Sequence, residues 1–310
     1  MSVTLMQPKR LKTGDTIAVV APASPLASRD VFDNGIVVLN RMGFRTRFDD
    51  RVFQSYRYLA GDDADRADEL MRAIEDPSVQ AIIALRGGYG CARLVPLLDE
   101  RKIRENRKIF MGFSDITTLH LLFNKCGWIT FHGPMAASVT LADISAECER
   151  HLVSLWTDPD YRAALRFPHL KIRSPGTAEG VLTGGCLSIV TASLGTPYEI
   201  QTKDAILFLE DTNEEPYRID RMITQLRLAG KLDSAAGILL GDFSDCEDPR
   251  GKYSVDDVLR DVLSGLNIPI LENFPAGHYT DDNWTLPFGV PARIIADERA
   301  LVFLESAVCR

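Results

Sequence analysis

Apolar and polar positions follow a repeating strand–helix pattern along the first half of the chain. Thr16–Ala21 is a short apolar run, typical of a buried strand, and Arg29–Met42 has helical spacing up to Gly43. The cycle recurs, with strands expected at 79–85, 108–112 and 128–132 and helices at 62–74 and 114–125. Strands that alternate with helices of this length predict a doubly wound, flavodoxin-like α/β fold with a parallel sheet.

The pattern breaks after residue 158. Pro159, Pro168, Pro175 and Gly176 lie close together, with mostly polar residues between them. We therefore predict an N-terminal domain at 1–160, a linker at 161–176 and a C-terminal domain at 177–310. The C-terminal domain is expected to hold mixed β structure with a few helices, with strands near 179–182, 205–210, 236–241, 268–271 and 300–304 and a helix at 217–229.

Composition narrows the class of protein. The 310 residues are 45% hydrophobic and 25% charged, which is typical of a globular protein, and the net charge of −8 argues against binding to nucleic acid. No secretory signal and no apolar run of membrane-spanning length is apparent, so we expect a cytoplasmic protein that binds no membrane. The six cysteines are scattered, without metal-ligand spacing, and we expect reduced thiols and no metal or other cofactor.

Ser114 is the first candidate for chemistry. It follows the predicted strand at 108–112 and begins the predicted helix at 114–125, in the sequence Gly112-Phe113-Ser114-Asp115. A serine on such a turn presents its hydroxyl at the carboxyl edge of the sheet, beside backbone N–H groups of the first helical turn. The alternative is a serine that only caps the helix, and local sequence alone does not decide between them.

A glycine-rich turn, Arg86–Gly90 (RGGYG), follows the preceding predicted strand. Glycines let the backbone approach a ligand closely and expose N–H groups as an anion-binding nest. The turn could supply half of an oxyanion hole or cradle a phosphate, although no established phosphate-binding motif is matched. A tight turn that only requires positive φ is the remaining alternative.

An acid and a histidine in the second half complete a possible serine–histidine–acid set. Glu210 ends an apolar strand, which would fix its position, whereas Glu214 and Glu215 follow in a polar loop. His278 lies in a loop after Gly277 and could act as a general base. His132, which ends a predicted strand near Ser114, is the rival base.

Five segments, in order along nearly the whole chain, resemble the LD-carboxypeptidase family of serine peptidases, which includes muramoyltetrapeptide carboxypeptidases and microcin-immunity peptidases. They are Ile17–Pro25 (IAVVAPASP), Leu85–Cys91 (LRGGYGC), Met111–Thr117 (MGFSDIT), Leu207–Arg221 (LFLEDTNEEPYRIDR), and Gly277-His278 together with Leu286–Gly289 (LPFG). The resemblance implies a catalytic triad of Ser114, His278 and Glu210. It also implies an oxyanion hole formed by the N–H groups of Gly88 and Asp115.

The resemblance further implies a muropeptide substrate, cleaved before the terminal D-alanine of its tetrapeptide stem. Arg86 is a candidate partner for a substrate carboxylate, with a structural ion pair as the alternative. Two other functions stay open: hydrolysis of peptidyl-adenylate mimics, as in microcin immunity, and non-catalytic binding of a small ligand between two domains. We expect a homodimer with the active site in the cleft between the domains.

Overall fold

The computed structural model describes residues 5–278 and 281–310, and the chain divides into two compact units. The first unit comprises Met1–Tyr161, Thr280–Gly289 and Ser306–Arg310. The second comprises Arg162–Tyr279 and Val290–Glu305. Each unit has its own sheet, so the chain is a two-domain α/β protein, as predicted.

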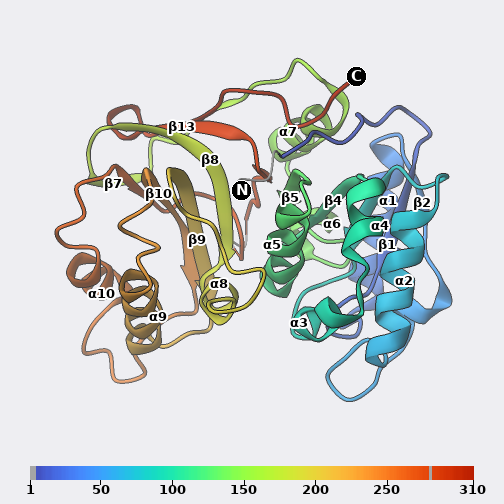
Figure 1. The fold of residues 1–310 in the computed structure, drawn as a ribbon, viewed down its shortest axis with the longest axis horizontal. Coiled ribbons are helices and arrows are strands. Elements are labelled where there is room, and N and C mark those ends of the chain that lie inside the picture. Colours follow the sequence, from blue (N-terminus) through green and yellow to red (C-terminus); the bar gives the residue numbers. More distant parts are fainter. Residues whose placement is uncertain (1–4, 279–280) are drawn as a thin grey trace. The chain divides into compact units, whose positions relative to one another are not determined.

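The first unit is built on a six-stranded sheet with the order β12-β5-β4-β3-β1-β2 (Figure 1). Neighbouring strands are parallel except for β12, which pairs antiparallel with β5. Every residue of β3 and β4 is buried, as expected for strands covered on both faces. The strands are β1 (Thr16–Val20), β2 (Arg45–Arg47), β3 (Ala81–Ala84), β4 (Ile109–Gly112), β5 (Thr130–His132) and β12 (Leu286–Phe288).

The strand order reverses beside β1, which is the mark of the predicted doubly wound fold. After β2 the chain returns to the other side of β1, so right-handed crossovers place α1 and α2 on opposite faces. In agreement, α1 packs against α6, whereas α2 contacts α3 and α4. The helices and short 3-10 turns of this unit are α1 (Arg29–Arg41), η1 (Asp50–Phe53), α2 (Asp63–Glu75), α3 (Cys91–Leu94), η2 (Val95–Leu97), α4 (Glu100–Glu105), η3 (Ser114–Ile116), α5 (Thr117–Lys125), α6 (Val139–Ala142) and α7 (Ala146–Thr157).

The second unit is built on an eight-stranded mixed sheet with the order β6-β14-β13-β8-β9-β10-β11-β7. The strands from β8 to β11 are parallel, and the flanking pairs are antiparallel. The elements are β6 (Ala164–Arg166), β7 (Lys171–Ser174), β8 (Thr177–Cys186), α8 (Leu187–Ala192), β9 (Ala205–Thr212), α9 (Pro216–Leu228), β10 (Gly237–Ser244), α10 (Val255–Val262), β11 (Ile270–Glu272), β13 (Pro291–Ile295), η4 (Ala296–Glu298) and β14 (Ala300–Phe303).

The domain boundaries differ from the prediction in two ways. The predicted linker at 161–176 instead carries β6 and β7, which pair with β14 and β11 of the second sheet. The predicted C-terminal domain at 177–310 is interrupted, because β12 and the last residues belong to the first unit. The many prolines in this segment led us to predict a linker in place of the short edge strands β6 and β7. Strand β12 has three residues, which is too few for the sequence to predict its pairing with β5.

The cysteines and helices add two observations. Each of the six cysteines is a free thiol, and all but Cys309 are buried. Within the described part of the chain, no helix combines the length and apolar character that a membrane crossing requires.

Candidate active site

Ser114 lies immediately beyond the carboxyl end of β4, in a strained backbone conformation. Its φ is 63°, in the left-handed region that residues other than glycine seldom adopt. The residue that caps the 3-10 turn η3 is Phe113, so Ser114 is not the helix-capping serine of the alternative interpretation. The Ser114 side chain is half-buried, and no hydrogen bond of its hydroxyl to another described residue is found. Strain of this kind recurs at active sites and nucleophile turns.

The glycine turn after β3 lies directly against Ser114. A Cβ atom at Gly87 would be 2.7 Å from Ser114 Cβ and 2.8 Å from Ser114 Oγ, so only glycine fits there. Gly88 has a φ of 109°, and a Cβ atom on it would be 2.5 Å from Cβ of Ser24 in the loop after β1. The turn therefore requires positive φ, as the tight-turn interpretation expects, and it also lies against Ser114, as a ligand-binding role would require.

The side chain of Asp115 connects the nucleophile turn to the end of the glycine turn. Asp115 is buried, and its Oδ2 accepts a hydrogen bond of 2.8 Å from the backbone N–H of Cys91. Burial raises the pKa of this carboxyl group, while the hydrogen bond from Cys91 opposes the rise. The backbone N–H groups of Gly88 and Asp115 donate to no other described residue, so both are available to a ligand.

Arg86 begins the glycine turn. Its Nη1 donates to the carbonyl of Pro25 over 3.2 Å, and no carboxylate of the described residues lies within ion-pairing distance of it. The structure therefore holds Arg86 by a backbone contact and not by the structural ion pair considered above.

The acid and the histidine lie together in the second unit. Glu210 lies near the carboxyl end of β9 and is fully buried. Its Oε2 accepts hydrogen bonds from Nδ1 of His278 at 2.6 Å and from the backbone N–H of His278 at 3.1 Å. Because an ionised carboxylate can only accept, Nδ1 carries the proton and the neutral ring has its lone pair on Nε2. This is the tautomer that a general base acting through Nε2 needs.

The surroundings of His278 favour the charged ring. Burial lowers the pKa of His278, but the charge of Glu210 and the hydrogen bond to it outweigh burial, so that the pKa lies above its usual value. Glu210 Oε1 is buried without a hydrogen-bond partner among the described residues, which leaves the carboxylate charge to act on the ring. Gly277 is required here, because its φ is 100° and a Cβ atom on it would be 2.5 Å from Glu210 Cγ.

The other acids considered at this site have different partners. Glu214 forms an ion pair of 3.6 Å with Arg218, and burial raises the pKa of its carboxyl group. Glu215 is the capping residue of α9 and makes no side-chain capping bond. Neither carboxylate forms a hydrogen bond with His278 in the described part of the chain.

The rival base, His132, lies in the interior of the first unit. Its side chain is fully buried, and its ring centroid is 5.3 Å from that of Phe288 and 6.0 Å from that of Phe113. Both nitrogens of its ring are buried, so neither is exposed to a substrate. The geometry therefore favours His278 over His132 as the base.

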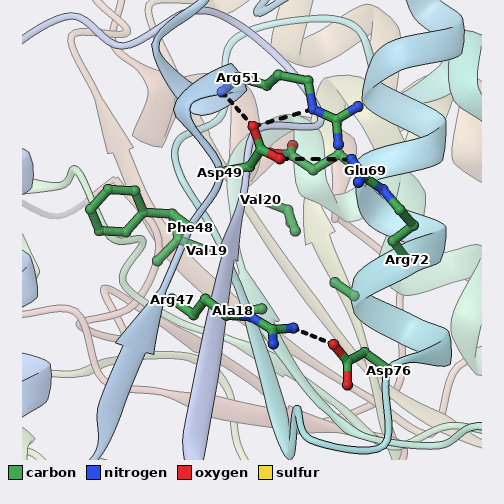
Figure 2. A pocket seen from close by; sticks show the side chains of 11 residues that line it. Ala18, Val19, Val20, Arg47, Phe48, Asp49, Arg51, Glu69, Arg72 and Asp76 are labelled. Carbon is green, nitrogen blue, oxygen red and sulfur yellow. Dashed lines mark hydrogen bonds and ion pairs between the residues drawn. The ribbon is translucent and has the colours of Figure 1, made fainter.

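A separate cavity of about 280 Å³ lies between α2 and the β1–β2 edge of the first unit (Figure 2). Arg47 pairs with Asp76 at one end, and Asp49 contacts Arg51 and Arg72 at the other. Glu69 is 8% exposed, and its Oε2 accepts a hydrogen bond of 2.8 Å from the N–H of Ala21, next to the loop that holds Ser24. The cavity shares no lining residue with the Ser114 turn, so we do not assign it to catalysis.

Sequence reasoning missed the supporting residues. Ser24 connects two loops, because its Oγ donates to the carbonyl of Tyr58 and accepts from the N–H of Tyr89. Asp115 was considered only for its N–H and not for its carboxylate. The signal for Ser24 was its place after β1, at the reversal of strand order where ligands bind in open α/β sheets. Among residues 5–278 and 281–310, no group of three or more possible metal ligands is found.

Comparisons with known proteins agree over both units. Residues 17–133 match the LD-carboxypeptidase N-terminal domain, and residues 179–294 match the LD-carboxypeptidase C-terminal domain. A Bacillus subtilis protein named as a probable murein peptide carboxypeptidase is 37% identical over 96% of this chain and 93% of its own.

Two solved structures are similar over almost the whole chain. MccF in complex with glutamyl sulfamoyl guanosine has a TM-score of 0.90 and 25% identity, covering 98% of this chain and 99% of that one. A muramoyltetrapeptide carboxypeptidase from Oxalobacter formigenes has a TM-score of 0.80 and 31% identity, covering 93% and 97%. The predicted fold class is confirmed, as is the prediction of a carboxypeptidase-type enzyme, and the chain belongs to the LD-carboxypeptidase family.

Proposed function

We propose that this protein is a serine carboxypeptidase that removes the terminal D-alanine from murein tetrapeptide stems. The observation that carries the proposal is the buried Glu210, which holds His278 by two hydrogen bonds and fixes its tautomer. Ser114, in its strained turn beside Gly87, is the proposed nucleophile. The same constellation of serine, histidine and acid recurs on unrelated folds, so it is recognised by geometry and role.

The proposed reaction begins when His278 Nε2 takes the proton of Ser114. The Oγ atom then bonds to the carbonyl carbon of the diamino acid that precedes D-alanine. His278, now charged, is stabilised by the Glu210 carboxylate, and it gives its proton to the nitrogen of D-alanine as the C–N bond breaks. Water, activated by the same ring, then cleaves the ester and releases the shortened stem.

Two backbone groups are proposed to stabilise the oxyanion of the tetrahedral intermediate. The N–H groups of Gly88 and Asp115 donate to no other described residue. Asp115 follows Ser114 in the chain, and Gly88 follows Gly87, the glycine that lies against Ser114. Removal of a single such donor typically costs about 3–4 kcal/mol of transition-state stabilisation. Arg86, which has no acidic partner among the described residues, is proposed to receive a substrate carboxylate.

Hydrolysis of a peptidyl-adenylate mimic is the second candidate, and the structural likeness to MccF favours it. Two observations support the murein substrate instead. Sequence identity is 37% to the probable murein peptide carboxypeptidase and 29% to MccF of Escherichia coli; among the solved structures it is 31% to the muramoyltetrapeptide carboxypeptidase and 25% to MccF. The three tryptophans, Trp128, Trp156 and Trp284, are buried and cannot stack on an adenine ring.

The proposal also includes a cellular compartment and an oligomeric state. The free thiols fit a reducing compartment such as the cytoplasm, and we propose a homodimer there. A non-catalytic binding role is the third candidate, but it gives no reason for a buried Glu210–His278 pair.

A competition between substrates tests the proposal. The protein is given a purified murein tetrapeptide and, separately, an aminoacyl-adenylate mimic, and kcat/KM is measured for each. We expect kcat/KM to be at least tenfold higher for the tetrapeptide. A preference for the adenylate mimic would replace the proposed function with the second candidate, and turnover of neither would favour non-catalytic binding.

A further inference from the structure

Three exposed tyrosines lie together near the nucleophile turn. Tyr56, Tyr58 and Tyr89 are 49%, 53% and 48% exposed, and they are the exposed aromatic residues found in the described part of the first unit. The rings of Tyr58 and Tyr89 contact each other, with centroids 5.8 Å apart and planes tilted by 59°. Exposed apolar patches on globular proteins commonly mark ligand or partner sites.

The backbone holds two of these tyrosines in place. Tyr58 lies at the tip of a tight turn that is closed by two hydrogen bonds between Tyr56 and Leu59. Ser24 Oγ donates to the carbonyl of Tyr58 at 2.9 Å and accepts from the N–H of Tyr89 at 3.1 Å. The hydroxyl of Ser24 thus holds the backbones of both tyrosine loops. Because the loops are already ordered, their backbones lose little conformational entropy when a ligand binds.

The tyrosine pair lies within reach of a substrate bound at Ser114. Tyr89 is two residues from Gly87, whose backbone touches Ser114, and two residues span at most about 7 Å. In a murein tetrapeptide, three residues lie between the cleaved bond and the amino sugar, and they extend to about 10 Å. The sugar end of the substrate is therefore of the right length to meet the two rings.

We propose that Tyr58 and Tyr89 form a subsite for the amino-sugar ring of the muropeptide. Because the two ring planes are inclined by 59°, a flat nucleobase cannot stack on both faces at once, whereas the C–H groups of a puckered pyranose can contact each ring. The ligand contacts apolar ring faces, and the phenolic hydroxyls can hydrogen-bond sugar hydroxyls. The guanidinium of Arg93 lies near both phenols and is paired with Asp63, so Arg93 adds no uncompensated charge to the Tyr58–Tyr89 pair.

This inference rests on the proposed function, and the experiment separates the two. Initial rates of D-alanine release are measured on a free tetrapeptide and on the same tetrapeptide carrying its sugar, with the wild-type protein and with the Tyr58→Leu/Tyr89→Leu double variant. Because the contact is remote from the reacting bond, its loss should raise KM and leave kcat unchanged. We expect about a tenfold higher KM on the sugar-bearing substrate, equivalent to about 1.4 kcal/mol, and less than a twofold change on the free tetrapeptide.

Two controls make the result specific. Tyr253→Leu removes an equally exposed ring from the second unit and should change neither KM. The Tyr58→Phe/Tyr89→Phe variant keeps both ring faces and should retain most of the affinity for the sugar-bearing substrate.

Three outcomes would overturn the subsite: the double leucine variant affects both substrates equally, the wild type shows no preference for the sugar, or the variant loses hydrolysis of an aminoacyl-adenylate instead. Failure of the wild type to release D-alanine from either substrate would contradict the proposed function itself. Activity of the double variant on the free tetrapeptide reports that it has folded.

Discussion

Ser114 combines two properties that an ordinary surface serine lacks. Its backbone is held at a φ of 63°, at a cost of about 1–3 kcal/mol, and its side chain lies against a glycine that cannot be replaced without overlap. The proposed role of Ser114 accounts for this backbone strain, because a nucleophile must present its hydroxyl in one direction.

Replacement of Ser114 by alanine should abolish hydrolysis and leave the fold intact. The loss should be several orders of magnitude, as for other serine triads, because alanine has no nucleophilic atom to replace the hydroxyl. Turnover is measured beside circular dichroism and thermal unfolding of the same sample. Activity above about a hundredth of the wild-type rate in a folded variant would exclude Ser114 as the nucleophile.

Glu210→Gln should lower kcat far more than Glu214→Gln or Glu215→Gln. Of these three acids, Glu210 is the one that hydrogen-bonds to His278, and its charge keeps the pKa of the ring above the usual value. In the wild type, activity should fall as the pH drops through that raised pKa, because the protonated ring cannot act as a base. Loss of the carboxylate lowers the pKa, so the acid limb of the residual pH–rate profile should move to lower pH.

The two flanking variants serve as matched controls, since they change the same functional group a few residues away. If Glu215→Gln is the most damaging of the three, or if the acid limb does not move in Glu210→Gln, the triad is misassigned.

At the scale of elements, most buried strands and the longer amphipathic helices were predicted, including three-residue β5 and β11, whereas the strands at the sheet edges were not. The apolar runs of β1, β3 and β4 and the amphipathic α1 and α2 agree with the structure within a few residues. The edge strands β2, β6, β7 and β12 have three or four residues each, and their pairing depends on partners far away in the chain. Periodicity cannot detect such strands, because too few positions alternate.

The candidate site likewise contains residues that the sequence predicted and residues that it did not. Residues of the triad lie in motifs that a family resemblance identifies. Ser24 and the carboxylate of Asp115 act by contacts to backbone atoms, which leave no pattern in the sequence. The steric need for glycine at 277 depends on the position of Glu210, 67 positions earlier in the chain.

Helix α2 holds the end of β1 through Glu69, and this contact should make stability depend on pH. Burial raises the pKa of Glu69 to about 7, whereas the unfolded chain has its ordinary value of 4.5. The folded state therefore binds the proton more tightly. The contribution of protonated Glu69 to the stability of the folded state is fully present below about pH 4.5 and is lost as the pH rises through about 7.

Glu69→Gln keeps an acceptor for the Ala21 N–H and removes the titration. The free energy of unfolding is measured with denaturant for the variant and the wild type. The difference, variant minus wild type, should increase by at most about 3 kcal/mol between pH 4.5 and 7.5. A difference that stays constant over this range would show that Glu69 titrates normally in the folded protein.

At the scale of the whole molecule, the proposed catalytic residues are divided between the two units. The nucleophile and the glycine turn belong to the first, and the base and its acid belong to the second. The reaction we propose requires that His278 reach Ser114 in the working enzyme, and that no metal take part.

Chelator treatment should therefore leave the rate of hydrolysis within about twofold of the untreated value. The residues described by the structure include no cluster of three metal-ligating side chains, and the proposed oxyanion donors are backbone N–H groups. Rates are compared before and after dialysis against EDTA. Inactivation that added zinc reverses would show that a metal is required.

The central claim is cleavage before the terminal D-alanine of a tetrapeptide stem by Ser114, and mass spectrometry of purified muropeptides incubated with the protein tests it most directly. Tetrapeptide and pentapeptide muropeptides are incubated with the wild type and with Ser114→Ala, and the products are weighed. The account predicts that the wild type removes one D-alanine from the tetrapeptide and none from the pentapeptide, while the variant removes none from either. An unchanged tetrapeptide with the folded wild-type protein, or an equal release by the variant, would contradict it.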